Sequence, residues 1–317
     1  MNPETPASAR MGDRFIDPRV LMAIRNLEWR ARVVVEGFRT GLHKSPYHGF
    51  SVEFTEYRQY TPGDDPRYLD WRVLGRSDRY FVKRFEDETN LRCHFLVDQS
   101  RSMDFGSAGH TKAAYAATLA ATLAWFLHQQ GDATGLMTFD AEVRDFLPAR
   151  HRPGHLRRLM LALEHPPGGK ATDLISPLRR ASEILRKRGV IVLVSDFLAP
   201  MDRLETSLTL LAAAGHEVSL FQVLDPLELS LDLGQPAWVE DVESGRRLFI
   251  DPAVVRQKYQ HRMEEHGAAL RTICQRLGMA WHRVVSDQPL EPALMEFLRD
   301  RSRRRPARRP GRHGARP

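Results

Sequence analysis

The feature that most constrains the fold is a short apolar segment followed at once by regularly spaced oxygen-bearing side chains. Residues 91–97, LRCHFLV, form an apolar run bounded by polar residues, which is typical of a buried strand. The run ends in Asp98-x-Ser100-x-Ser102, one carboxylate and two hydroxyls. Small divalent cations prefer such oxygen ligands, and open α/β sheets place their sites beyond the carboxyl ends of strands. The motif therefore predicts a cation site.

A simpler interpretation of the same residues stays open. Asp and Ser often bind the backbone where a turn or helix begins, so Asp98 and Ser100 would then only cap the turn that follows. We expect Lys112, early in the next helix, to be exposed.

After residue 91, predicted strands alternate with predicted helices. The expected strands are 91–97, 133–139, 143–147, 189–195, 216–223 and 279–285, and the expected helices are 112–130, 156–163, 174–187, 201–214, 252–277 and 291–301. This alternation predicts an α/β fold, a mainly parallel sheet with helices on both faces and right-handed crossovers. Residues 235–250 differ, because two short apolar segments flank Glu243-Ser244-Gly245, which predicts an inserted β-hairpin.

The same pattern divides the chain into four parts. They are a loose leader (1–14), a helix-and-strand appendage (15–90), the α/β domain with its hairpin (91–298) and a disordered Arg-rich tail (299–317). Within the appendage we expect a helix over 17–38 and strands over 51–60 and 79–85.

The net charge of +7 comes from the tail rather than from the body of the protein. Residues 299–317 hold nine arginines and one aspartate, which leaves 38 basic and 39 acidic residues elsewhere. A nearly neutral body argues against a nucleic-acid-binding surface there. Contact with nucleic acid is therefore expected only through the tail.

Cysteine usage and hydropathy favour a cytoplasmic protein. Cys93 and Cys274 are far apart in apolar segments, which predicts two reduced thiols in the core. The most apolar run, 113–127, has 15 residues and is too short to cross a bilayer.

Two further segments can contribute ligands at the edge where Asp98 ends its strand. Thr172 lies in a Gly-rich segment just before a predicted helix, and Asp196 directly follows the apolar strand 189–195. A doubly wound sheet brings such strand-end loops towards one crevice. We therefore expect Asp98, Ser100, Ser102, Thr172 and Asp196 to form one site.

This five-residue pattern resembles the metal-ion-dependent adhesion site (MIDAS) of von Willebrand factor A domains. The resemblance implies a Rossmann-like α/β fold and a bound Mg²⁺, or Mn²⁺. It also implies that Ser100, Ser102 and Thr172 hold the ion directly or through water, while Asp98 and Asp196 mainly hydrogen-bond those groups and the waters.

A second resemblance lies upstream of the site. Residues 54–71, FTEYRQYTPGDDPRYLDW, and 83–86, KRFE, resemble the signature of the bacterial domain of unknown function 58 family, and the similarity runs from about residue 35 to 300. In that family the signature precedes an A-like domain. Longer members carry transmembrane helices before the signature, so this chain is expected to be a cytoplasmic form. Family members are commonly encoded beside MoxR-type AAA+ ATPases, which implies such a partner.

The signature residues Asp64, Asp65, Asp70 and Trp71 allow two interpretations. They can form a partner surface or brace the metal edge. Alternatively, Pro62–Pro66 is a turn, and Asp70 and Trp71 anchor the appendage on the domain.

The function that these features predict is Mg²⁺-dependent binding of a protein that supplies a carboxylate to the metal. The chain would be a non-enzymatic adaptor of a MoxR-type AAA+ ATPase in assembling or activating a complex. A metal-assisted hydrolase is a second hypothesis, although no His, Cys or Lys in a motif accompanies the ligands as a general base. A nucleic-acid-associated protein acting through the tail is the third.

Overall fold

The computed structural model describes residues 15–43, 57–59, 81–83, 91–168, 174–240 and 245–304. The chain separates into two units: one comprises the residues up to Arg39 together with those from Leu91 onward, and the other is Thr40–Asn90. In the second unit, the described residues after the end of α2 (Leu27–His43) form two short antiparallel strands, β1 (Tyr57–Gln59) and β2 (Phe81–Lys83).

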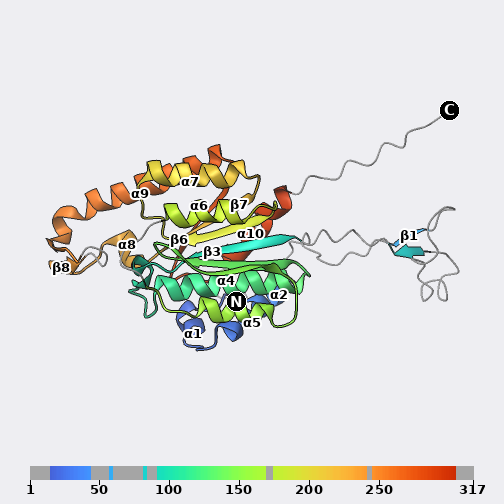
Figure 1. Ribbon diagram of the computed structural model, residues 1–317. Helices are drawn as coiled ribbons and strands as arrows, with labels where there is room; N and C mark the ends of the chain where they lie inside the picture. The colour runs from blue at the N-terminus through green and yellow to red at the C-terminus, as the bar shows by residue number, and fades with distance from the viewer. Residues whose placement is uncertain are drawn as a thin grey trace, which may run out of the picture. The chain divides into compact units, whose positions relative to one another are not determined.

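The main unit is built on a six-stranded sheet in which five strands are parallel (Figure 1). In spatial order its strands are β10 (Ala280–Val285), β7 (Glu217–Leu224), β6 (Val190–Ser195), β3 (Arg92–Asp98), β4 (Ala133–Phe139) and β5 (Val143–Arg150). Only the edge strand β5 runs antiparallel to its neighbour, β4. The predicted α/β fold with a mainly parallel sheet is confirmed.

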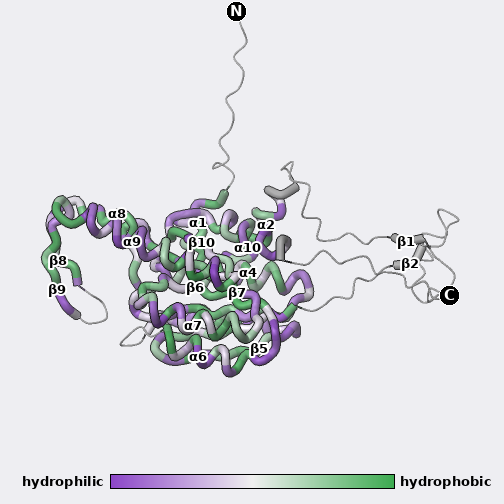
Figure 2. The backbone as a smooth tube through the Cα atoms, turned by 90° about the horizontal axis from the view of Figure 1, so that it is seen from above, coloured by the Kyte–Doolittle hydropathy of each residue, from purple (hydrophilic) through white to green (hydrophobic). Residues whose placement is uncertain are grey.

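Helices cover both faces of this sheet (Figures 1 and 2). One face carries α1 (Pro18–Met22), α2 (Leu27–His43), α4 (Lys112–Gln129), α5 (His155–Leu163) and α10 (Glu291–Arg304). The other carries α6 (Ile175–Ile184), α7 (Met201–Ala213) and α9 (Pro252–Arg276). Cys93 and Cys274 are both buried free thiols, as predicted.

The two central strands explain why the sheet is covered on both sides. Every residue of β6 is buried, and in β3 only the first is exposed. Alternate side chains of an apolar strand point to opposite faces, so both faces need a helical cover. On the α6, α7 and α9 face, Leu96 and Leu193 enter a core that also contains Leu208 and Leu270. The two strands lie side by side at the centre of the sheet, so the loops that follow them are neighbours at one edge.

The N-terminal helical segment differs from the sequence prediction in two ways. The expected single helix over 17–38 is broken into α1 and α2, because the Asn26 side chain accepts a hydrogen bond from the Trp29 amide and starts a new helix. The segment also belongs with the sheet rather than with an appendage spanning 15–90. Its contacts reach far along the chain: Ile16 N donates to Glu291 and Leu27 N donates to Glu164.

The boundary of the C-terminal tail also differs. We expected disorder from residue 299, but α10 continues to Arg304. Arg301 pairs with Asp132 at 2.9 Å, and cationic side chains in a last turn favour the helix dipole. Residues 305–317 and the leader, 1–14, lie outside the described residues.

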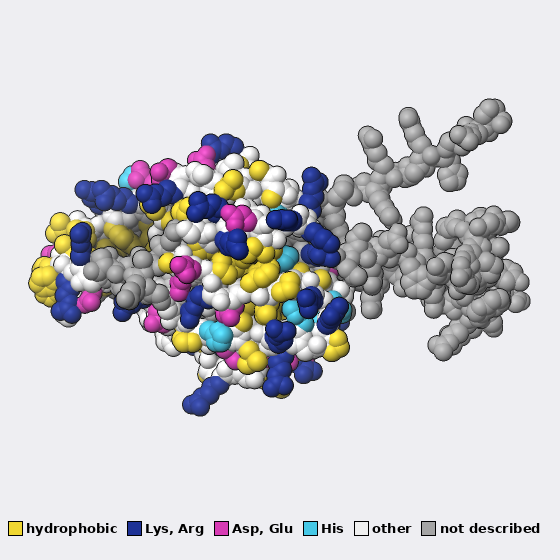
Figure 3. Space-filling view, in the orientation of Figure 1, with side chains coloured by type: hydrophobic (Ala, Val, Ile, Leu, Met, Phe, Trp, Pro, Cys, Tyr) yellow, Lys and Arg dark blue, Asp and Glu magenta, His cyan; other side chains and the backbone are white. Residues whose placement is uncertain are grey.

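The predicted hairpin is present as the antiparallel strands β8 (Ala237–Glu240) and β9 (Arg247–Ile250), which project from the body (Figure 2). Trp238 and Phe249 are cross-strand partners that remain 69% and 55% exposed. Figure 3 shows hydrophobic side chains gathered at this end of the molecule. A short helix that the sequence did not predict, α8 (Pro226–Ser230), precedes the hairpin.

No helix among the described residues combines the length and the apolar composition that a membrane span requires.

Candidate metal centre

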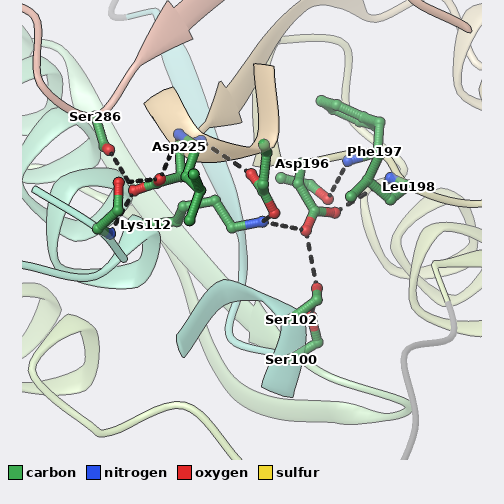
Figure 4. A network of polar contacts seen from close by, with 12 residues as sticks. Ser100, Ser102, Lys112, Asp196, Phe197, Leu198, Asp225 and Ser286 are labelled. Carbon is green, nitrogen blue, oxygen red and sulfur yellow. Dashed lines mark hydrogen bonds and ion pairs between the residues drawn. The ribbon is translucent and has the colours of Figure 1, made fainter. Parts of the chain in front are cut away.

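Four neighbouring parallel strands end in polar residues at the same edge of the sheet. Asp98 ends β3, Asp196 follows β6, Asp225 follows β7 and Ser286 follows β10. We call the connected set Asp98, Ser100, Ser102, Lys112, Asp196, Asp225 and Glu228 the polar edge; Figure 4 shows most of its contacts.

Asp98 is fully buried and organises the loop after β3. Its Oδ1 accepts a hydrogen bond from the Ser100 amide at 2.8 Å, and its Oδ2 accepts one from the Ser195 hydroxyl at 2.6 Å. The first contact is the turn-capping bond of the simpler interpretation. Ser100, however, begins the following 3-10 helix (Arg101–Asp104) without a side-chain capping bond, and its Oγ lies 3.1 Å from Ser102 Oγ. Capping therefore accounts for Asp98 but not for the two hydroxyls.

Asp196 joins the loop after β6 to the loop after β3. Ser102 Oγ donates to Asp196 Oδ2 at 2.9 Å, and the Leu198 amide donates to Oδ1 at 3.2 Å. Phe197 adopts a φ of 55°, a left-handed conformation that costs a non-glycine residue about 1–3 kcal/mol. The Ser195 hydroxyl accepts from the Phe197 amide at 3.0 Å and supports this turn. The backbone thus turns sharply where Asp196 meets Ser102.

Lys112 contradicts the expectation that it is exposed. Its side chain is fully buried, and its Nζ lies 2.8 Å from Asp196 Oδ2 and 2.6 Å from Glu228 Oε1 (Figure 4). Thr111 caps α4 through its hydroxyl, which places Lys112 at the first helical position, close to the strand ends. The sequence around Lys112 gives no sign of this, because its two partners lie 84 and 116 residues away.

Asp225 and Glu228 extend the polar edge and were missed in the sequence. They form a capping box at α8, in which Asp225 N donates to Glu228 Oε2 at 2.9 Å. Asp225 Oδ2 also accepts from the Ser107 amide at 2.8 Å and from the Ser286 hydroxyl at 3.3 Å. The sequence does contain a helix-start signal here: Asp225 and Pro226 directly follow a strand, and Glu228 lies three residues after Asp225.

Burial shifts the acid–base properties of the polar edge. Desolvation, with the nearby Asp196 carboxylate, raises the pKa of Asp98 to about 7. Burial also raises the pKa of Glu228, although Lys112 acts in the opposite sense. For Lys112, burial disfavours the ammonium, but the carboxylates of Asp196 and Glu228 outweigh it and its pKa stands above the ordinary value. Within the described residues, Asp196 therefore has a cation beside it, the Lys112 ammonium, whereas Asp98 has none.

The oxygen atoms of Ser100, Ser102 and Asp196 are hydrogen-bonded to one another at distances that a small divalent cation also accepts. The distance from Ser100 Oγ to Ser102 Oγ is 3.1 Å, and the distance from Ser102 Oγ to Asp196 Oδ2 is 2.9 Å. Adjacent ligands of an octahedral Mg²⁺ stand about 2.9 Å apart. Within the described residues, no three His, Cys, Asp or Glu side chains gather into a metal cluster, so a site here would depend on hydroxyls.

Thr172, the remaining predicted ligand, lies outside the described residues. The last described residue before it, Gly168, donates its amide to Gln99 O at 2.9 Å, beside Ser100. The structure thus brings together four of the five predicted site residues. Asp64, Asp65, Asp70 and Trp71 also lie outside the described residues, and both interpretations of them remain predictions.

Comparison with known proteins gives matches over most of the chain. The family described as "Protein of unknown function DUF58" matches residues 56–269. The uncharacterized protein Rv1480 of Mycobacterium tuberculosis is 31% identical over 307 residues, which cover 94% of each chain. Among solved structures, the conserved hypothetical protein BatB from Bacteroides thetaiotaomicron gives a TM-score of 0.44 at 14% identity, covering 67% of this chain and 98% of that one. The SpRpn10 VWA domain gives a TM-score of 0.40 at 13% identity, and the match covers 65% of this chain and 94% of that one.

Proposed function

We propose that this chain, which belongs to the DUF58 family of proteins of unknown function, is a non-enzymatic protein-binding module that acts through a divalent cation. The observation that carries the proposal is that the Ser100 and Ser102 hydroxyl oxygens lie 3.1 Å apart, as adjacent ligands of one small ion do, while Asp196 accepts the hydrogen bond of Ser102. They come from two adjacent strand ends, so the sheet itself holds them in place.

In this proposal Ser100, Ser102 and Thr172 hold Mg²⁺, while Asp98 and Asp196 orient those ligands and their waters. Three neutral hydroxyls leave the bound ion positively charged, which makes it attractive to a carboxylate of another protein. The chain's own part is positioning: Asp98 fixes the Ser100 backbone, and Asp196 fixes the Ser102 hydroxyl.

We propose a MoxR-type AAA+ ATPase as the partner, because members of the family that this chain resembles are commonly encoded beside such ATPases. The exposed Trp238 and Phe249 on the projecting hairpin support a docking role in a second way, because exposed aromatic side chains are enriched at protein interfaces.

The test is a pull-down of a purified MoxR-type ATPase from the same genome, with the full chain as bait. We expect capture in Mg²⁺, and a loss of at least about tenfold in EDTA or with Ser102→Ala. Ser182→Ala, which removes a hydroxyl on α6 away from the polar edge, serves as the matched control and is expected to bind like the wild type.

Equal capture in Mg²⁺ and EDTA would contradict the metal-dependent mechanism. Turnover of phosphoesters or peptides by the wild type, lost with Ser102→Ala, would favour the hydrolase hypothesis instead.

A further inference from the structure

A buried lysine at a divalent-cation site is unexpected, because it brings a second cation to the same carboxylate. Lys112 is fully buried, and its Nζ lies 2.8 Å from Asp196 Oδ2. The same oxygen accepts the hydrogen bond of Ser102. One carboxylate oxygen thus faces both the lysine and a proposed metal ligand.

Two cations that share one buried carboxylate oppose each other. Electrostatic repulsion is strong where burial lowers the local dielectric, and Lys112 and Asp196 are 0% and 1% exposed. In the absence of metal, the lysine neutralises Asp196, a charge that otherwise stands beside the buried Asp98. A divalent ion that engages Asp196 has to displace part of this interaction.

The structure also provides a second partner for the displaced lysine. Glu228 Oε1 lies 2.6 Å from Lys112 Nζ, while its other oxygen, Oε2, is held by the Asp225 amide at 2.9 Å. Asp225 is itself fixed by the amides of Ser107 and Leu227. Glu228 is therefore anchored in place, and Lys112 keeps a counter-ion when Asp196 is engaged elsewhere.

From this geometry we propose that Lys112 is a built-in counter-ion that competes with the divalent cation for Asp196, and so sets the affinity of the site for metal. The inference rests on the proposed function and deepens it, since it concerns the regulation of the same site. Lys112 acts here as a positioning residue, because it acts on the metal through Asp196.

The test is isothermal titration of MgCl₂ into the full-length protein, with folding checked by circular dichroism. Lys112→Met removes the competitor, and we expect Mg²⁺ to bind at least about tenfold more tightly. Glu228→Gln leaves Lys112 with Asp196 as its anionic partner, and we expect weaker binding. Lys187→Met serves as the matched control, because Lys187 is exposed and lies before β6, at the other end of that strand; its affinity is expected to stay at the wild-type value.

The double variant Lys112→Met/Glu228→Gln separates competition from net charge. It removes one charge of each sign, so an effect of overall charge predicts the wild-type affinity, whereas competition predicts tighter binding. Wild-type or weaker binding in folded Lys112→Met or in the double variant overturns the inference. If neither variant folds, Glu228→Gln is compared with the exposed, charge-matched Glu183→Gln: unchanged affinity in Glu228→Gln, or a loss no larger than that in Glu183→Gln, overturns the inference, and a larger loss supports it.

The two proposals fail in different ways. Binding by the wild type that does not tighten in Lys112→Met defeats only the role of Lys112. Binding that is detectable only in Lys112→Met supports competition and sets the wild-type affinity below the range of the assay. No Mg²⁺ binding by any of the proteins overturns both proposals.

Discussion

Two ion pairs of nearly equal length occupy opposite environments in this protein. Lys112 and Asp196 are 2.8 Å apart in the polar edge, with side chains 0% and 1% exposed. Arg247 and Glu240 are 2.7 Å apart on the hairpin, with side chains 70% and 50% exposed. The distances alone would rank the two pairs as equals, so any difference between them arises from burial.

Burial makes the first pair costly to form and costlier to break. The free-energy cost of removing two charges from water offsets most of their electrostatic attraction. A buried ion pair is therefore weak evidence for stabilisation. Losing one partner leaves the other charge buried, whereas an exposed charge is simply solvated. The polar edge thus holds buried charge that a gain in stability does not explain. The hairpin keeps its charges in water and exposes apolar rings instead.

The largest expected effect comes from breaking the buried pair. Lys112→Ala leaves the carboxylates of Asp196 and Glu228 without their shared buried cation. We expect the free energy of unfolding to fall by about 3–5 kcal/mol. Urea denaturation in EDTA, followed by circular dichroism, measures it.

The matched control breaks the exposed pair. Glu240→Ala on the hairpin should change the free energy of unfolding by only about 0–1 kcal/mol. Similar losses in the two variants would show that burial does not separate the pairs.

A smaller effect, of opposite sign, is expected at Asp98. Within the described residues this buried carboxylate has hydrogen bonds but no ion-pair partner, unlike Asp196. Its pKa is raised from 3.8 to about 7, so ionisation destabilises the fold: the penalty is absent below about pH 4, grows as pH rises and is complete above about pH 7. In EDTA, Asp98→Asn should therefore be more stable than the wild type at pH 8, by at most about 4 kcal/mol.

Urea titrations of both proteins between pH 4 and 8 check the sign. The difference in the free energy of unfolding between the two proteins should grow with pH. A difference that is constant or that shrinks as pH rises would contradict the claim that Asp98 lacks a cationic partner.

The sequence predicted the framework of the fold well, because the framework depends on local patterns. The strand 133–139 is found as β4 with the expected bounds, and the apolar run before Asp196 is the fully buried β6. The end of a helix was harder to place: α10 continues into the Arg-rich segment, where Arg301 pairs with Asp132. The break between α1 and α2 depends on the single capping residue Asn26.

The candidate site was predictable only where its residues follow strands. Asp98, Ser100, Ser102 and Asp196 do so, and the structure places them in one network. Lys112 was misjudged because a lysine near the start of a helix is usually solvated, and its burial depends on two carboxylates distant in sequence. Glu228 was not predicted as part of the site because α8 has only five residues, too few to show a helical hydrophobic pattern.

The central claim, that this edge holds a divalent cation, is tested most directly by crystals of the full-length protein grown with Mn²⁺. The account predicts an anomalous diffraction peak within about 2.5 Å of the Ser100 and Ser102 hydroxyl oxygens, with Asp98 and Asp196 beside it. A peak elsewhere, or no peak at this edge of the sheet at saturating Mn²⁺, would contradict it.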